Sequence, residues 1–183
     1  MILKHLKTRT ETLHKDTEKD NLAKYILDHS ITLNQYQSLL LKNYTAYATL
    51  LKLNQKYSDL LPVALKPFAD SEKTDALKKD LVSLSIPVPA IDEPNVKMNI
   101  SSASILGMLY VAEGSMMGGL LIRKNLEDCP HLRDIEKHHF FGKKAPEVLN
   151  RWKSFTETVN LNTYTDAEVD EAVEGANYAF SIF

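Results

Sequence analysis

Residues 101–126, SSASILGMLYVAEGSMMGGLLIRKNL, place four of the six glycines of the chain inside one helical pattern. The pattern begins at Ser101 or Ser102, either of which can cap a helix, and Cys129-Pro130 follows its end. Each helical glycine costs about 0.8–1 kcal/mol relative to alanine. A marginally stable domain does not carry that cost without compensation. The stretch therefore predicts that something lies close against its backbone.

The glycines favour one side of this helix. Gly107, Gly114 and Gly118 fall within about 60° of one another at about 100° per residue, so they form a strip of bare backbone. Tight packing against a neighbouring helix explains such a strip, and so does a flat, bulky ligand that would clash with any Cβ atom. The adjacent Gly118 and Gly119 favour the ligand, because two glycines loosen a helix and permit a kink that packing does not need.

Helical spacing of apolar residues continues through most of the chain. No repeat, low-complexity tract or Gly/Ser-rich linker divides it. We therefore expect a single-domain, all-α bundle of about seven to eight helices over residues 1–183. The expected elements are helices at about 2–18, 71–84, 102–126, 131–140 and 165–183, a short segment at 21–29, a long helix from Ser30 or Thr32 to before Pro62, a helix from Ala145 to beyond Val159, and an extended loop at 86–95.

The composition is that of a soluble globular protein without a strong charge bias. The chain has 183 residues, of which 44% are hydrophobic and 25% charged, and its formal net charge is −2. A nucleic-acid-binding domain is usually basic, so we expect no nucleic-acid partner. The single cysteine, Cys129, excludes an intramolecular disulfide and a multi-cysteine zinc site and fits a reducing compartment. The N-terminal residues MILKHLK lack a signal-peptide pattern, so we expect a cytoplasmic protein.

The apolar stretch from Ser104 to Ile122 is long enough to be mistaken for a membrane span. Glu113 lies in its middle, and a carboxylate there costs about 2.5–3.5 kcal/mol on insertion scales. The rest of the chain offers no second span. We therefore expect no membrane partner.

A second motif lies near the N-terminus, on the helix that contains His14. Glu18 follows His14 by one helical turn and can accept a hydrogen bond from one imidazole nitrogen, which orients the other nitrogen outward, as in metal-bound histidines. Lys7 lies two turns before His14 on the same face and can reach an anionic group beside it. A surface His–Glu pair worth a few tenths of a kcal/mol is the better explanation of the spacing when His14 is considered alone.

Together the two motifs resemble those of the biliverdin-producing heme oxygenase family, in its bacterial form. Residues 6–14, LKTRTETLH, and Glu18 are similar to the proximal helix of that family, and residues 109–119, LYVAEGSMMGG, to its distal helix. Residues 170–183 are similar to the last helix of the family. The order, separation and coverage of these segments also fit, so the resemblance extends over most of the chain.

The resemblance implies that heme, as both cofactor and substrate, lies between the two helices. It implies that His14 is the proximal iron ligand, oriented by Glu18, and that Gly114, Gly118 and Gly119 form the distal wall with Ser115 beside them. The implied reaction is oxidative cleavage of heme to biliverdin, carbon monoxide and ferrous iron by O2. A separate reductase or ferredoxin must supply the electrons, because the chain has no Gly-x-Gly-x-x-Gly nucleotide motif.

The chain departs from the family pattern at three positions. Ser115 stands where mammalian-type members have an aspartate, and a serine hydroxyl both donates and accepts hydrogen bonds without being a charged anchor. Glu11 and Glu157 stand where basic residues would bind the heme propionates. The basic residues left for the propionates are Lys7, Arg9 and Lys153.

These departures leave two other functions open. A non-catalytic heme-binding or heme-sensing protein of the same fold is favoured by Ser115, Glu11 and Glu157. A thiaminase-like pocket enzyme of related helix arrangement would need a catalytic cysteine, and Cys129 beside a helix-breaking proline is a poor candidate. Glu136-x-x-His139 has the spacing of a di-iron bundle motif, but a di-iron site also needs two further glutamates from other helices.

Overall fold

The structure is a computed structural model that describes residues 1–19 and 21–183. Within these residues it contains eight α-helices and no β-strand, which confirms the predicted all-α fold. The helices are α1 (Ile2–Arg9), α2 (Glu11–Lys19), α3 (Lys24–Leu27), α4 (Leu33–Lys56), α5 (Glu72–Ser83), α6 (Ser102–Leu126), α7 (Ala145–Asn160) and α8 (Asp166–Ile182). Short 3-10 segments lie at Ser58–Leu60, Val63–Phe68 and Pro130–Leu132.

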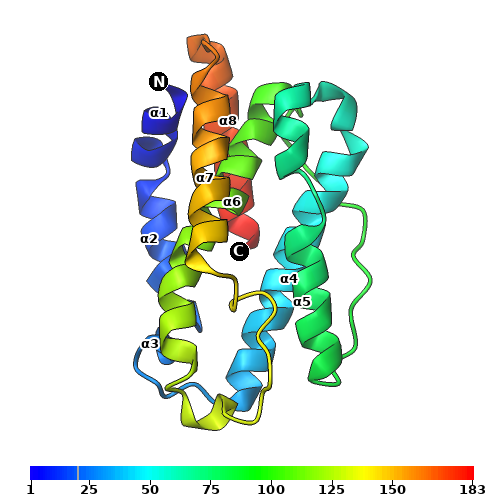
Figure 1. Cartoon of the computed structure of the whole chain (residues 1–183). Coiled ribbons are helices and arrows are strands. Elements are labelled where there is room, and N and C mark those ends of the chain that lie inside the picture. Colours follow the sequence, from blue (N-terminus) through cyan, green and yellow to red (C-terminus); the bar gives the residue numbers. More distant parts are fainter. Residues whose placement is uncertain (20) are drawn as a thin grey trace.

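Helix α6 runs through the middle of the bundle (Figure 1). It packs mainly against α8 and also contacts α7, α3 and α4. Helices α4 and α5 pair with each other, and α1 and α2 lie along α8. The buried core between these helices is aliphatic and aromatic, with fully buried members that include Leu6, Tyr36, Leu77, Ile105 and Phe155.

Polar side chains determine where three of the helices begin. Thr32, Ser101 and Thr165 each accept a hydrogen bond from the backbone N–H three residues later, in a capping box. The predicted start at Thr165 is thus confirmed, and the two ambiguous starts resolve to Thr32 and Ser101.

The tightest helix contact is between α6 and α8. A Cβ atom on Gly107 would lie 1.8 Å from the carbonyl oxygen of Ala172, and one on Gly175 would lie 1.9 Å from that of Ser104. The backbones of the two helices therefore touch at these positions, and any side chain there would push them apart. Gly107 is a packing glycine, and it does not share an open strip with Gly114 and Gly118.

The predicted helix over residues 2–18 is divided into α1 and α2 at Thr10. The backbone at Thr10 departs from helical geometry, with φ −107° and ψ 3°. Its buried hydroxyl donates to the carbonyl oxygen of Leu6 at 2.8 Å, and that competing bond favours a bend.

The helix predicted at 131–140 is wrong. Only Pro130–Leu132 forms a 3-10 turn, and the following residues form a loop. The backbone N–H groups of His139 and Phe140 donate to the buried carboxylate of Asp80, at 2.6 and 2.8 Å, so they have a partner outside any helix. Burial raises the pKa of Asp80. This contact fastens the loop to α5.

Helix α6 is long and apolar enough to cross a membrane by length and composition. Its most hydropathic window has a mean hydropathy of 1.6, but 56% of that window is buried inside the protein. The apolarity of α6 is therefore accounted for by its central position in the bundle.

Replacement of glycine by alanine should have opposite effects on stability at two positions of α6. Gly107→Ala should lower the free energy of unfolding by about 1–3 kcal/mol, because the added methyl forces α8 away. Gly119→Ala should raise it by up to about 1 kcal/mol, since nothing lies within 4 Å of the new methyl and alanine favours the helix. Urea denaturation of both variants measures the two changes. Equal effects would contradict the division of the glycines into packing and open positions.

Candidate functional site

The second half of α6 carries three glycines that do not serve helix packing. Apart from α6 itself, no heavy atom of residues 1–19 and 21–183 lies within 4 Å of a Cβ position on Gly118 or Gly119. A Cβ on Gly114 would contact only the edge of the Trp152 ring, at 3.7 Å. Gly118 and Gly119 therefore present bare backbone to open space, as a flat ligand against this face requires, whereas Gly114 faces the Trp152 ring.

Ser115 lies on the same face as Gly118 and Gly119, one turn away, and is exposed. Its hydroxyl donates to the carbonyl oxygen of Ala112 at 3.0 Å. It lies 2.5 Å from the hydroxyl of Tyr47 on α4, so Tyr47 is the donor in that bond. Burial raises the pKa of Tyr47, which keeps the phenol protonated. From the helical spacing of its apolar neighbours alone, Tyr47 is expected only in the core or a pocket wall.

His14 lies on α2 with its side chain 55% exposed. Its Nδ1 is 3.6 Å from a carboxylate oxygen of Glu18, one turn along the helix. The imidazole ring packs edge to face on Phe180 of α8, with 5.6 Å between ring centroids. Phe180 and Glu18 thus both contact the ring of His14, and Nδ1 is the nitrogen nearer the carboxylate.

The last turn of α8 connects the two halves of the candidate site. Phe180 packs on His14, and Phe183 packs on Tyr47 with 4.9 Å between ring centroids. Tyr47 in turn bonds to Ser115. The similarity of residues 170–183 to the last helix of the family did not single out these two phenylalanines, because aromatic residues at a helix end are equally typical of a core.

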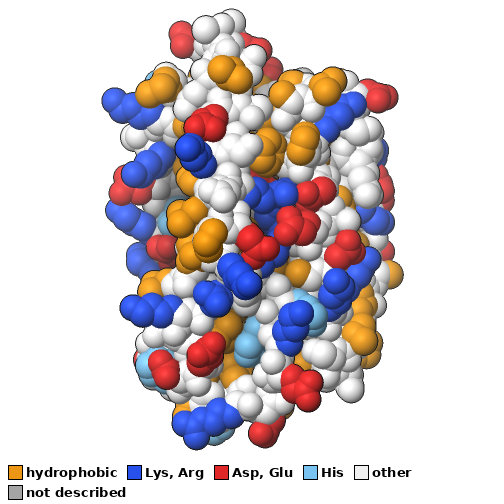
Figure 2. Space-filling model, in the orientation of Figure 1, with side chains coloured by type: hydrophobic (Ala, Val, Ile, Leu, Met, Phe, Trp, Pro, Cys, Tyr) orange, Lys and Arg blue, Asp and Glu red, His pale blue; other side chains and the backbone are white. Residues whose placement is uncertain are grey.

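The three basic residues expected near the site lie at the surface, on two different helices. Figure 2 shows basic side chains along α1 and α2, where Lys7 and Arg9 are exposed. Arg9 pairs with Asp170 of α8 at 2.6 Å. Lys153 of α7 is 73% exposed, with a carboxylate oxygen of Glu157 at 3.8 Å. Arg9 is thus engaged in a contact between helices, whereas Lys153 has only a long contact within its own helix.

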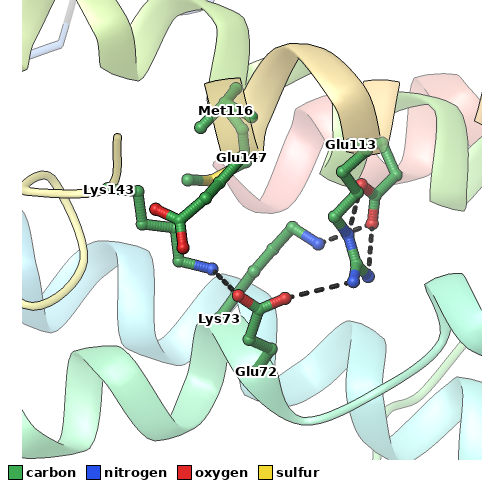
Figure 3. Close-up of a pocket in the computed structure, with 8 residues that line it drawn as sticks. Glu72, Lys73, Glu113, Met116, Lys143 and Glu147 are labelled. Carbon is green, nitrogen blue, oxygen red and sulfur yellow. Dashed lines mark hydrogen bonds and ion pairs between the residues drawn. The ribbon is translucent and has the colours of Figure 1, made fainter. Parts of the chain in front are cut away.

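A cluster of charged groups lies on another side of α6, directly before the glycines. Its centre is Glu113, whose side chain is 1% exposed. The Glu113 carboxylate accepts from Lys73 Nζ of α5 at 2.5 Å and from Arg151 Nε and Nη2 of α7 at 2.8 and 3.0 Å. Figure 3 shows Lys73 and Glu113 pointing toward each other. One carboxylate therefore ties α6 to both α5 and α7 at the residue before Gly114.

The cluster continues outward to solvent. Arg151 also donates to Asp70 and Glu72, and Lys143 pairs with Glu72 at 2.5 Å. Figure 2 shows acidic and basic side chains gathered at the middle of this face. The ion cluster, as used below, consists of Asp70, Glu72, Lys73, Glu113, Lys143 and Arg151.

Lys73 was not among the predicted site residues, although its position in the sequence carries a signal. Lys73, Leu77 and Leu81 recur every four residues, so the lysine lies on the apolar stripe of α5. A lysine at such a position must find a partner or reach the surface. Its side chain is 7% exposed, and the partner is Glu113.

Known proteins that resemble this chain are heme oxygenases. A family model described as Heme oxygenase matches residues 1–183. Heme oxygenase PigA of Pseudomonas aeruginosa is 25% identical over 179 residues, or 96% of this chain and 82% of that protein. A heme oxygenase of Xanthomonas campestris pv. campestris is 32% identical over 111 residues, or 61% of this chain and 64% of that protein. The fold matches that of the NO- and CO-bound heme oxygenase from Neisseria meningitidis, with a TM-score of 0.73 at 22% identity, over 99% of this chain and 87% of that one.

The buried centre of the ion cluster predicts a large stability effect. Glu113→Gln should lower the free energy of unfolding by about 3–5 kcal/mol, because it leaves the buried Lys73 without its counter-charge. Glu157→Gln is a matched control at an exposed position of α7, and it should change stability by less than about 0.5 kcal/mol. Urea denaturation distinguishes the two. Similar losses in both variants would show that burial of Glu113 is energetically unimportant.

Proposed function

The chain belongs to the heme oxygenase family, and from this premise we propose that it cleaves heme oxidatively to biliverdin, carbon monoxide and ferrous iron. Heme is its cofactor and substrate. The observation that carries the proposal is the bare backbone at Gly118 and Gly119, which faces open space from inside a helix. Such positions suit a flat macrocycle, which approaches closer to glycine backbone than to any other residue.

On the proximal side, the proposed iron ligand is His14. Its Nε2 is the nitrogen free to bind a metal, since Nδ1 lies nearer Glu18. A carboxylate on the second nitrogen holds the ring orientation and makes the ligand more basic. Phe180 limits rotation of the same ring from the other side.

On the distal side, the proposed catalytic residues are Gly114, Ser115 and Gly118. Together with Gly119, these two glycines would bring helix backbone against one face of heme and restrict the space left there for O2. Ser115 presents a hydroxyl on that face and receives a hydrogen bond from Tyr47. The Ser115 hydroxyl therefore holds a proton at an exposed oxygen, and the protonated phenol of Tyr47 hydrogen-bonds to that oxygen from the buried side.

The proposed propionate-binding residues are Lys7, Arg9 and Lys153, all of which are exposed basic residues. Lys153 has only a long contact with Glu157 to exchange for a propionate, whereas Arg9 must give up its bond to Asp170. When bound, heme supplies the activation of O2 and the oxidation of its own ring. We infer that a separate reductase or ferredoxin delivers the electrons, that residues 1–183 act as one heme oxygenase-like domain, and that the protein works in the cytoplasm.

One observation favours a second candidate, a heme-binding protein without turnover. The hydroxyl proton of Ser115 is directed to the carbonyl oxygen of Ala112 rather than toward the open face. A protein that keeps this bond would bind heme and deliver no proton to it.

Spectroscopy with added hemin tests the proposed function. Hemin should give a Soret band, and ascorbate or a reductase with oxygen should remove it and produce the broad long-wavelength absorption of biliverdin. A Soret band that persists under these conditions would support the non-catalytic alternative.

His14→Ala tests the ligand within the same assay. The substitution removes the only proposed protein bond to iron, so the Soret band should shift or disappear, and added imidazole should restore it. His5→Ala, at an exposed position of α1, is the control and should behave as the wild type. An unchanged spectrum in His14→Ala would refute this ligand.

Gly118→Leu tests the distal wall. No atom outside α6 in the described part of the chain lies within 4 Å of the new Cβ atom, so helix content and unfolding should be nearly unchanged, yet the side chain should prevent heme from binding, because it extends into the space above α6. Lys124→Leu places the same side chain at another exposed position of α6 and should leave heme binding intact. Circular dichroism with hemin titration measures both properties. Normal heme affinity in Gly118→Leu would exclude this face as the wall.

A further inference from the structure

Two consecutive residues of α7 meet two consecutive residues of α6 at the start of the open glycine face. Arg151 donates to the carboxylate of Glu113, at 2.8 Å from Nε and 3.0 Å from Nη2. The outer edge of the Trp152 ring lies beside the next residue, Gly114, at 3.7 Å from the position that a Cβ atom would take. Because Glu113 is 1% exposed, breaking its ion pairs is costly, so α7 resists sliding along α6. The Trp152 ring is therefore held at Gly114.

Other aromatic rings hold the orientation of Trp152. Its ring stacks on Phe155, with 5.7 Å between ring centroids and an interplanar angle of 26°. It also contacts Tyr110 of α6, with 5.9 Å between centroids. Phe155 is itself fully buried and packs edge to face on Phe68. Contacts with α6 and with the buried core therefore leave the indole little freedom to change its rotamer.

The outer edge of Trp152 bounds the glycine strip at one end. Gly114 and Gly118 lie one helical turn apart on the same side of α6, and Gly118 faces open space. A flat ligand that lies over Gly118 and extends toward Gly114 therefore meets the edge of the indole. Trp152 is partly exposed, as a ring that borders an open space must be.

The side chains around this end of the strip differ in polarity. Trp152 offers an apolar ring edge, and Ser115, which follows Gly114, presents an exposed hydroxyl. Lys153, which follows Trp152, is 73% exposed, with a carboxylate oxygen of Glu157 at 3.8 Å. A few well-placed groups of this kind are enough to fix the orientation of a bound small molecule. Heme has apolar methyl and vinyl groups on one part of its rim and propionates on another, so such groups distinguish its edges.

We propose that Trp152 is a specificity-determining residue of the site. The edge of its ring accepts a methyl- or vinyl-bearing edge of heme and excludes a propionate, and it thereby selects the meso carbon that lies beside Ser115. A propionate against the indole would lose its hydration without gaining a partner, which is costly for a carboxylate. The inference rests on the proposed function, because the choice of a meso carbon has a consequence only if heme is cleaved.

Trp152→Phe is the most informative variant. Phenylalanine keeps an aromatic ring for Phe155 but lacks the outer edge of the indole, which is the part beside Gly114. The biliverdin isomers formed by wild type and variant are separated by liquid chromatography after turnover. Their ratio should change by about 10-fold or more, because a gap of about one methylene in a fitted pocket alters discrimination that much. Trp152→Ala, which removes the whole ring, should change the ratio further.

The cyanide complex of the hemin-loaded protein gives a readout without turnover. Proton NMR of the heme methyl groups reports how the macrocycle is rotated in its own plane. The pattern of methyl shifts in Trp152→Phe should differ from that of the wild type. A residue with only a structural role would lower the midpoint of urea denaturation and leave the methyl shifts unchanged.

Leu161→Ala is the matched control. It removes an apolar side chain that is 85% exposed directly after α7, so both the isomer ratio and the methyl shifts should be those of the wild type. Lys153→Ala tests the competing explanation, in which the propionate contact alone orients the ligand.

Wild-type isomer ratios and wild-type methyl shifts in both Trp152 variants would overturn the proposal. A change in Lys153→Ala without any change in the Trp152 variants would assign the orientation of the ligand to the propionate contact instead. If the wild-type protein binds hemin without degrading it, the proposed function fails, and the methyl shifts alone then decide whether Trp152 orients the ligand.

Discussion

The backbone contact between α6 and α8 is the constraint on which the rest of the structure depends. A glycine on each helix removes the side chain that would otherwise separate them. Because α8 lies so close to α6, its last turn reaches the space between α2 and α4. Phe180 there contacts His14, and Phe183 contacts Tyr47. The end of α8 and the residue that follows it therefore contact both His14 and Tyr47, and two glycines set how close α8 lies to α6.

The ion cluster holds α6 from another side. A buried ion pair adds little net stability, because desolvation of both charges offsets their attraction. Removal of one partner is nevertheless costly, so the contacts of Glu113 with Lys73 and Arg151 specify where α6 lies against α5 and α7. Since Gly114 and Ser115 follow Glu113 directly, that position also determines where the proposed distal face begins. Helix packing against α8 and ion pairing with α5 and α7 thus both position α6.

Features that depend on neighbouring residues were predictable from the sequence. Features that depend on residues far away in the chain were not. The capping residues and the spacing of His14 and Glu18 depend on neighbours within one or two turns, and a single sequence contains that information. The loop at 131–140 depends on Asp80, which accepts two backbone hydrogen bonds from far along the chain. The buried Lys73 likewise depends on Glu113 of another helix. Sequence periodicity reports that such a residue faces inward, and not what it meets there.

The sequence by itself determined the all-α class, the concentration of glycine in one helix and the resemblance to heme oxygenases. Only the tertiary structure decided which glycine does what. Gly107 faces the backbone of α8, whereas Gly118 and Gly119 face open space, although all three share one helix and one residue type. A glycine has no side chain whose chemistry would indicate its partner. Its role is set by what lies opposite, and that is decided when distant helices pack together.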